Sequence, residues 1–255
     1  MPTSLLFECI DEVVPAITHV VNESFLSGTF PSMFKPAIVK PLLKKPSLDR
    51  DDLKNYRPVS NLSFLPKVAE KLVLPQLSEY LNANQLFSPV QSAYRPNYST
   101  ETALVKIVND LLLALDDGKV SDLTLLDLSA AFDTIYHNIL LYRQEHAFGI
   151  TGTALSWIRL YLSDRDHQTV VVNGLKSEPF RLLYGVPQGS VLGPILFVLY
   201  TKPLDDILTA TKYAIPHLQM IPRCRTLALL NLIQPFKPCK NMFLMFKSWM
   251  TLNRL

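Results

Sequence analysis

The residue in this sequence that most clearly suggests chemistry is Asp127, which follows the apolar run at 123–126. A carboxylate at the end of a buried strand needs a cation, several hydrogen-bond donors or a metal ion to offset the loss of water. With an acid from a neighbouring strand, it would form the oxygen-lined site that magnesium prefers. The alternative is a strand-end aspartate that caps the next turn, with Ser129 and Asp133 as further local acceptors.

A second candidate is the segment at 184–194, YGVPQGSVLGP, which holds three of the eight glycines. Gly185 and Gly189 allow positive φ or a close backbone approach, and Ser190 is placed to cap a following helix. A nucleotide could lie against this surface, with Gln188 offering both a donor and an acceptor. The alternative is a tight loop between a hairpin and a helix. The segment is not a phosphate-binding P-loop, because GxxxxGK[ST] is absent.

Two hexapeptides, NYRPVS at 55–60 and QSAYRP at 91–96, each place an aromatic residue beside an arginine and then a proline. Arginine suits bidentate phosphate contacts, and proline stiffens the loop that presents it. Arg57 also lies in a basic window, whose other members are Lys35, Lys40, Lys44, Lys45, Arg50, Lys54, Lys67 and Lys71. Such a window could contact phosphates, and an ordinary solvated face is the alternative.

The composition is that of a globular chain, with 48% hydrophobic and 18% charged residues, while a net charge of +3 says little about partners. The cysteines lack paired or zinc-like spacing, which favours a reducing compartment, and the location within the cell, nucleus or cytoplasm, is left open. Apolar runs are too short to span a bilayer and no secretory signal is recognisable, so we expect no membrane. We also expect a piece of a longer protein, and the oligomeric state is left open.

The elements that must position these residues are helices mixed with short strands. Apolar periodicity predicts helices at 4–26, 66–81 and 100–115. Strands are predicted at 37–43, an edge strand because of Pro41, and at 123–128, buried on both faces. A hairpin region is predicted at 168–184 around an Asn173-Gly174 turn. This order of elements predicts an α+β fold.

Taken together, four segments resemble the reverse transcriptases of LINE-type retrotransposons, which lack long terminal repeats. NYRPVSNLSFLPKVAEKL at 55–72 is similar to the first fingers motif of that family, and QSAYRPNYSTETAL at 91–104 to the second. LLDLSAAFDTI at 125–135 is similar to the first palm motif, and GVPQGSVLGPILF at 185–197 to the motif that supports the nucleotide. The resemblance covers about residues 30 to 208.

The resemblance implies an RNA-directed DNA polymerase with right-hand polymerase-like fingers and a partial palm. Its partners would be an RNA template, a DNA primer and a deoxynucleoside triphosphate (dNTP), and its cofactors two magnesium ions (Mg2+). The expected regions are a helical lead-in at 1–34, a fingers-like region at 35–120, a partial palm at 121–210 and an aberrant tail at 211–255.

The resemblance also implies a role for each matching residue. Asp127 would be the first catalytic, metal-binding carboxylate, and the backbone carbonyl of Leu128 would also face a metal ion. Phe132 would be the steric gate beneath the sugar 2′ position. The other residues expected to bind the incoming nucleotide are Lys44, Lys45, Arg57, Arg95, Gln188 and Gly189.

The chain departs from the family where an aromatic-Ala-Asp-Asp motif should follow the PQG segment. Residues 213–224 read YAIPHLQMIPRC, and no acid follows Asp206. If the last base of each codon is joined to the first two of the next across HLQMIPRC, the reading Phe-Ala-Asp-Asp-Thr-Gln-Val becomes available. We therefore hypothesise a frameshift after Asp206, with chance as the alternative. Residues 247–253 resemble the family again, as if the original frame returns. A separate, smaller departure is Tyr136, which stands where relatives have an acid.

The sequence therefore predicts a reverse transcriptase fragment from a decayed retroelement that is catalytically inactive as it stands. Without a second pair of carboxylates, two metal ions cannot be held in the usual way. One alternative is a non-catalytic remnant that binds RNA or a primer–template, and another is a product that never folds stably.

Overall fold

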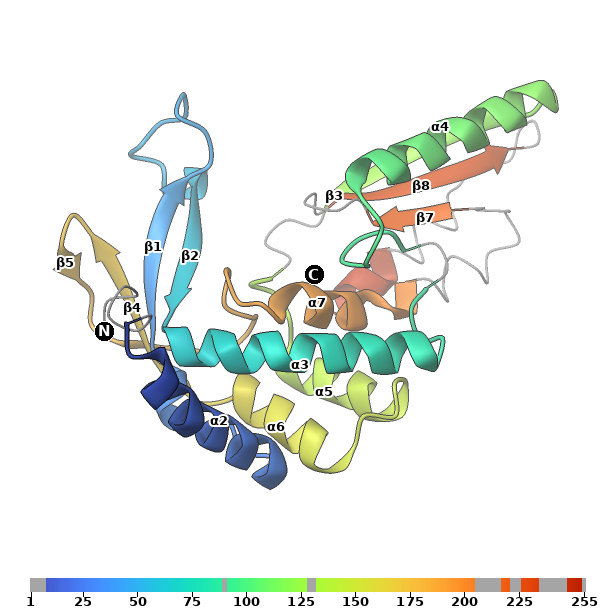
Figure 1. Cartoon of the computed structure of the whole chain (residues 1–255). Coiled ribbons are helices and arrows are strands. Elements are labelled where there is room, and N and C mark those ends of the chain that lie inside the picture. Colours follow the sequence, from blue (N-terminus) through green and yellow to red (C-terminus); the bar gives the residue numbers. More distant parts are fainter. Residues whose placement is uncertain are drawn as a thin grey trace. The chain divides into compact units, whose positions relative to one another are not determined.

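The computed structural model describes residues 8–88, 91–127, 132–204, 217–220, 226–233 and 247–253. The chain divides into two compact units. Unit 1 comprises Met1–Leu77 and His137–Gly193, and unit 2 comprises Ser78–Tyr136 and Pro194–Leu255. Helices and strands are mixed along the chain, as the predicted α+β class requires (Figure 1).

Unit 1 contains a sheet with the strand order β2-β1-β4-β5, in which β6 also pairs with β4. Its strands are β1 (Ala37–Leu43), β2 (Tyr56–Leu62), β4 (Arg165–Val172), β5 (Leu175–Lys176) and β6 (Phe180–Leu182). β1 is antiparallel to β2 and parallel to β4. β4 pairs with both β5 and β6, and Asn173 and Gly174 have positive φ in the turn, which confirms the predicted hairpin region.

The prediction that β1 is an edge strand is wrong, because β1 lies between β2 and β4. β2 is instead an edge strand of this sheet, and its Pro58 lies opposite Pro41. Ser60, two residues further along β2, donates its N–H away from β1 to the carbonyl oxygen of Gln188, at 2.7 Å. Because donors alternate in direction along a strand, the nitrogen of Pro58 also faces outward, where proline removes no hydrogen bond of the ladder.

The helices of unit 1 are α2 (Ile10–Ser27), α5 (His137–His146) and α6 (Gly152–Leu162), and α3 (Phe64–Ala83) begins there. Trp157 of α6 joins α6 to α2, because its indole donates to Ser24 Oγ at 2.9 Å. α2 ends at Gly28, where φ is 65° and a Cβ would lie 2.8 Å from the carbonyl oxygen of Thr153. Glycine is therefore required for this close approach of the two helices.

The helices predicted at 4–26 and 66–81 correspond to α2 and α3, with shifted ends, and residues 4–7 lie outside the described residues. The patterns at α5 and α6 gave no prediction. Among the described helices, none is both long and apolar enough to cross a bilayer.

Unit 2 contains an antiparallel sheet of β3 (Val120–Asp127), β8 (Thr226–Ile233) and β7 (His217–Met220), in the order β3-β8-β7. The helix α4 (Thr100–Asp116) begins at a capping box formed by Ser99 and Thr102 and packs against β3 (Figure 1). This confirms the helix predicted at 100–115. The strand predicted at 123–128 is also present as far as Asp127, but Leu123 is exposed, so burial on both faces is wrong at that residue.

Candidate functional site

The loop at 185–192 is held against the edge strand β2 through its two central residues. The carbonyl oxygen of Gln188 accepts the N–H of Ser60 at 2.7 Å, and the N–H of Ser190 closes a turn onto Pro187 at 3.0 Å. Gly189 has a φ of 107°, and a Cβ at this position would lie 2.9 Å from the carbonyl oxygen of Ser60. These contacts fix the backbone of Gln188 and Gly189, which are predicted to contact the nucleotide. At position 189 only glycine permits the close approach to Ser60.

Side chains from two further elements hold the ends of this loop. His137, the first residue of α5, places Nε2 2.7 Å from the carbonyl oxygen of Gly185. A carbonyl can only accept, so Nε2 carries the hydrogen. At the other end, Glu70 of α3 accepts the N–H groups of Val191 and Leu192, the latter at 3.1 Å.

The electrostatics beneath the loop are set by burial. Burial raises the pKa of the Glu70 carboxyl, although the two backbone donors and the charge of Arg165 act in the opposite direction. Burial also lowers the pKa of His137, against the effect of its bond to Gly185, and the charge of Arg165 lowers it further. In both side chains the charged form is the costly one in a buried environment.

The sequence analysis assigned no role to Glu70, His137 or Arg165, although Glu70 lies in the first fingers-like motif. Glu70 left a detectable signal, because it stands on the buried stripe of α3 marked by Pro66, Leu77 and Leu81, at steps of four and seven residues. A charged residue on an apolar stripe indicates a buried partner. The partners come from β4 and from the loop after β6, so no local pattern identifies them.

The predicted triphosphate-binding residues Lys44, Lys45 and Arg57 are exposed on the β1–β2 hairpin. Lys44 is at the outer end of the hairpin. Its backbone N–H donates to the carbonyl oxygen of Asn55, and its side-chain ammonium donates to the carbonyl oxygen of Lys54 at 2.6 Å. Arg57 is paired with Leu42 in the ladder. The structure therefore brings these cations onto one hairpin, and their role with phosphate stays a prediction.

Acidic residues share the loop of this hairpin with the cations. Asp49 and Asp52 accept backbone N–H groups of Asp51 and Lys54, at 3.0 and 2.9 Å. Within the described ranges, no ion pair connects these acids to the hairpin cations. The positive side chains therefore remain available to a ligand, although the acids reduce the net charge of the loop.

Arg95, also predicted to bind the nucleotide, is held by its own loop in unit 2. Its Nη1 donates to the carbonyl oxygens of Ser88 and Gln91, at 3.2 and 3.3 Å. Its guanidinium lies over the rings of Phe87 and Tyr98, at 5.5 and 4.9 Å from their centroids. These contacts give Arg95 a role in ordering the loop, and a contact with the nucleotide stays a prediction.

Asp127 is the last residue of β3, where the ladder pairs it with Thr226 of β8. Neither β8 nor β7 contains an acid. Leu128 lies outside the described residues. The ring of Phe132 is half-buried and lies 5.6 Å from the ring of Phe197 in α7 (Gly193–Thr201). In the part of the chain that the structure describes, no group of three His, Cys, Asp or Glu side chains is placed to hold a metal ion.

Comparison with known families decides the assignment. Residues 43–221 match the family described as reverse transcriptase (RNA-dependent DNA polymerase). The match covers more than half of the 255 residues. The chain belongs to the reverse transcriptase family.

Relatives of this reverse transcriptase chain come from mobile elements. It is 31% identical over 151 residues to a probable RNA-directed DNA polymerase from transposon BS of Drosophila melanogaster, covering 59% of this chain and 16% of that protein. It is 28% identical over 212 residues to the RNA-directed DNA polymerase from mobile element jockey of the same species, covering 79% and 23%. The probable enzyme from transposon X-element of that species is 28% identical over 190 residues, covering 74% and 20%.

The predicted resemblance to LINE-type reverse transcriptases is thereby confirmed. The chain spans about a fifth of the length of these relatives.

Proposed function

We propose that this chain is a fragment of a retrotransposon reverse transcriptase domain that does not polymerise by itself. In this proposal the region at 35–120 corresponds to the fingers and the region at 121–210 to a partial palm. The β1–β2 hairpin and the loop at 185–192 would support the nucleotide, and β3 would be the first palm strand. In the intact family enzyme, a primer 3′-hydroxyl would attack the α-phosphate of a dNTP, and pyrophosphate would leave as the bond between the α- and β-phosphates breaks.

The sheet that carries Asp127 is the main support for inactivity. Asp127 lies opposite Thr226, and the polar residues that β7 and β8 contribute are all without a carboxylate: His217, Gln219, Thr226 and Asn231. Magnesium prefers carboxylate and other oxygen ligands in near-octahedral geometry, and a two-metal site shares several carboxylates. Within the described residues, the donors that this sheet supplies do not fit two magnesium ions.

Primer extension tests the proposal directly. The purified 255-residue chain is incubated with magnesium, a primed RNA template and dNTPs, beside an Asp127→Asn variant. We expect no template-directed product from either protein. Template-directed synthesis that Asp127→Asn abolishes would overturn the proposal.

The coding DNA tests the proposed origin of the missing acids. We expect two adjacent Asp codons in the shifted frame across 217–224, in the position that the resemblance assigns to the second palm motif. A shifted frame without them would exclude the frameshift there, while leaving the inactivity of the chain untouched.

The second candidate function is binding of RNA or a primer–template without catalysis. The exposed cations of the β1–β2 hairpin, which make no ion pair with a described acid, favour it. Phosphate contacts by such side chains release counterions, so the affinity should fall steeply with salt.

Measuring RNA affinity across a salt series tests this candidate. Arg57→Gln should reduce the slope of log affinity against log salt by about one. Arg159→Gln is the matched control, because Arg159 is an exposed arginine on α6 in the same unit. Equal slopes for the wild type and both variants would count against binding through the hairpin.

A further inference from the structure

Three buried polar side chains, here called the floor cluster, lie beneath the loop at 185–192. They are Glu70 of α3, Tyr161 of α6 and Arg165, the first residue of β4. Each is at most 1% exposed. Arg165 Nε donates to the carbonyl oxygen of Tyr161 at 2.8 Å, and its guanidinium lies 4.6 Å from the centroid of the Tyr161 ring. A buried arginine fixed in this way places a positive charge permanently inside unit 1.

The floor cluster contacts the loop through Glu70. One oxygen, Oε2, accepts the N–H groups of both Val191 and Leu192, which precede α7. Charged acceptors make stronger hydrogen bonds than neutral ones, and N–H groups before a helix have no partner within it. The carboxylate therefore fixes the backbone of the last residues of the loop.

Four other polar atoms of the cluster are buried, and none makes a hydrogen bond of ordinary geometry in the described part of the chain. They are Glu70 Oε1, Tyr161 Oη and both Nη atoms of Arg165. Buried polar atoms are almost always hydrogen-bonded, so we expect internal water to bind here.

Burial disfavours both charges, since it raises the pKa of Glu70 and lowers the pKa of Arg165, while each charge favours the ionised form of the other, although no ion pair between them is present among the described residues. Removing one of two opposite buried charges leaves the other uncompensated and is costly, whereas removing both together is often tolerated. This asymmetry separates a coupled pair from two residues that fill space independently.

We propose that Glu70 and Arg165 are a coupled pair of positioning residues that fix the backbone of the loop at 185–192. In this pair Glu70 bonds the loop directly, and Arg165, anchored to Tyr161, acts through Glu70. This inference concerns the geometry of the loop, and only its meaning for nucleotide binding rests on the proposed function.

Hydrogen exchange at single amides of the full chain tests the pair. In Glu70→Gln, which keeps an acceptor oxygen but loses the charge, the amides of Val191 and Leu192 should exchange about tenfold faster. Arg165→Met should have a similar effect. The amide of Lys44, bonded within the hairpin, should be unchanged in both variants.

The double variant Glu70→Gln/Arg165→Met distinguishes positioning from a purely space-filling role. In the double variant neither charge is left uncompensated. The fold-increase in the exchange rate at Val191 and Leu192 should therefore be smaller than the product of the fold-increases in the two single variants. Additive effects would overturn the coupling, and unchanged exchange in the single variants would overturn the positioning role. If the single variants do not fold, recovery of folding in the double variant supports the pair, and its absence contradicts it.

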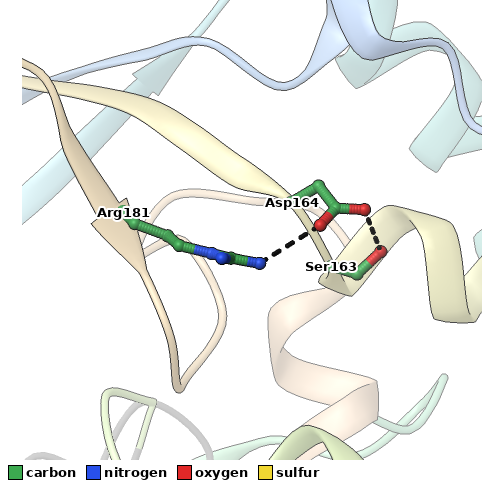
Figure 2. Close-up of polar contacts among 3 residues, drawn as sticks. All are labelled: Ser163, Asp164 and Arg181. Atoms are coloured by element: carbon green, nitrogen blue, oxygen red, sulfur yellow. Dashed lines mark hydrogen bonds and ion pairs between the residues drawn. The ribbon is translucent and has the colours of Figure 1, made fainter.

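Two exposed residues provide matched controls. Glu79→Gln removes a carboxylate from the same helix as Glu70, and Glu79 is exposed. Arg181→Gln removes an arginine that reaches Asp164, the residue before Arg165, at 3.2 Å (Figure 2). Neither should change exchange at Val191 or Leu192, and an effect as large as that of Glu70→Gln would count against a role specific to the buried pair.

Binding of an oligo(dT)-primed poly(rA) duplex and dTTP, measured on the same variants, separates this inference from the proposed function. Faster exchange with weaker binding supports both. Faster exchange with unchanged binding supports the positioning pair and counts against nucleotide contact by the loop.

Discussion

Two titratable side chains hold opposite ends of the loop at 185–192, and burial shifts their pKa values in opposite directions. For Glu70 the folded-state pKa lies above the ordinary value of 4.5, so its contribution to stability is present below 4.5 and is lost as the pH rises through the folded value. For His137 the folded-state pKa lies below the ordinary value of 6.5, so its contribution is present above 6.5 and is lost as the pH falls through the folded value.

We predict that the free energy of unfolding of the wild type, relative to Glu70→Gln, falls as the pH rises above 4.5 and levels off above the raised pKa of Glu70. The variant cannot lose a proton at this position, so the difference isolates one carboxyl. Urea unfolding at several pH values measures it. Glu79→Gln should show no such trend, and a difference that grows with pH would contradict the prediction.

We also predict that the wild type loses stability relative to His137→Gln as the pH falls below 6.5. The unfolded chain takes up the proton more readily than the buried imidazole, which Arg165 disfavours further. Thermal unfolding between neutral and mildly acidic pH measures the effect. His146→Gln, at an exposed position on the same helix, is the control, and an equal shift in both variants would show that burial of His137 is not the cause.

The edge strand β2 explains why the loop at 185–192, although rich in glycine and proline, has one defined backbone conformation. An edge strand leaves outward N–H groups without partners, and β2 satisfies one of them with the carbonyl oxygen of Gln188. The same contact brings Gly189 against the backbone of Ser60. The edge of the sheet and the loop therefore stabilise each other.

We predict that Gly189→Ala destabilises the chain by at least about 1 kcal/mol more than Gly174→Ala. Both glycines have positive φ, which costs an alanine about 1–2 kcal/mol. Only at 189 would the new Cβ also meet a backbone oxygen, whereas at 174 nothing lies within 4 Å. Chemical denaturation of the two variants measures the difference, and equal losses would show that the loop can move away from β2.

At the scale of the whole chain, the predicted site residues are divided between the two units. Unit 1 contains the hairpin cations, Gln188 and Gly189, and unit 2 contains Arg95, Asp127 and Phe132. Arg165 is buried in unit 1, and trypsin cuts only after accessible basic residues. Resistance to cleavage after Arg165 therefore distinguishes a folded chain from a product that never folds.

We predict that limited trypsin digestion cuts the hairpin loop after Arg50 or Lys54 well before it cuts after Arg165. Both loop sites are exposed, and Arg165 is 1% exposed. Mass spectrometry of a digestion time course orders the cuts, with the urea-denatured chain as the control. Cleavage after Arg165 at the rate of the loop sites would support the alternative of a chain that is not stably folded.

The sequence alone determined the features that depend on local spacing. Apolar periodicity and the start signal at Ser99 predicted α4, and Asn173-Gly174 predicted the turn of the β4–β5 hairpin. The four motifs and their order also indicated the reverse transcriptase family, and the sequence itself shows that no acid follows Asp206.

Only the tertiary structure decided which residues hold the loop at 185–192 and which arginine is free to meet a ligand. Arg57 and Arg95 stand in similar hexapeptides, yet Arg57 is exposed and Arg95 is bonded within its own loop. Glu70, His137 and Arg165 come from three elements far apart in sequence, and burial gives them their unusual electrostatics. The cost of burying a charge depends on neighbours that folding supplies, and no local pattern records those neighbours.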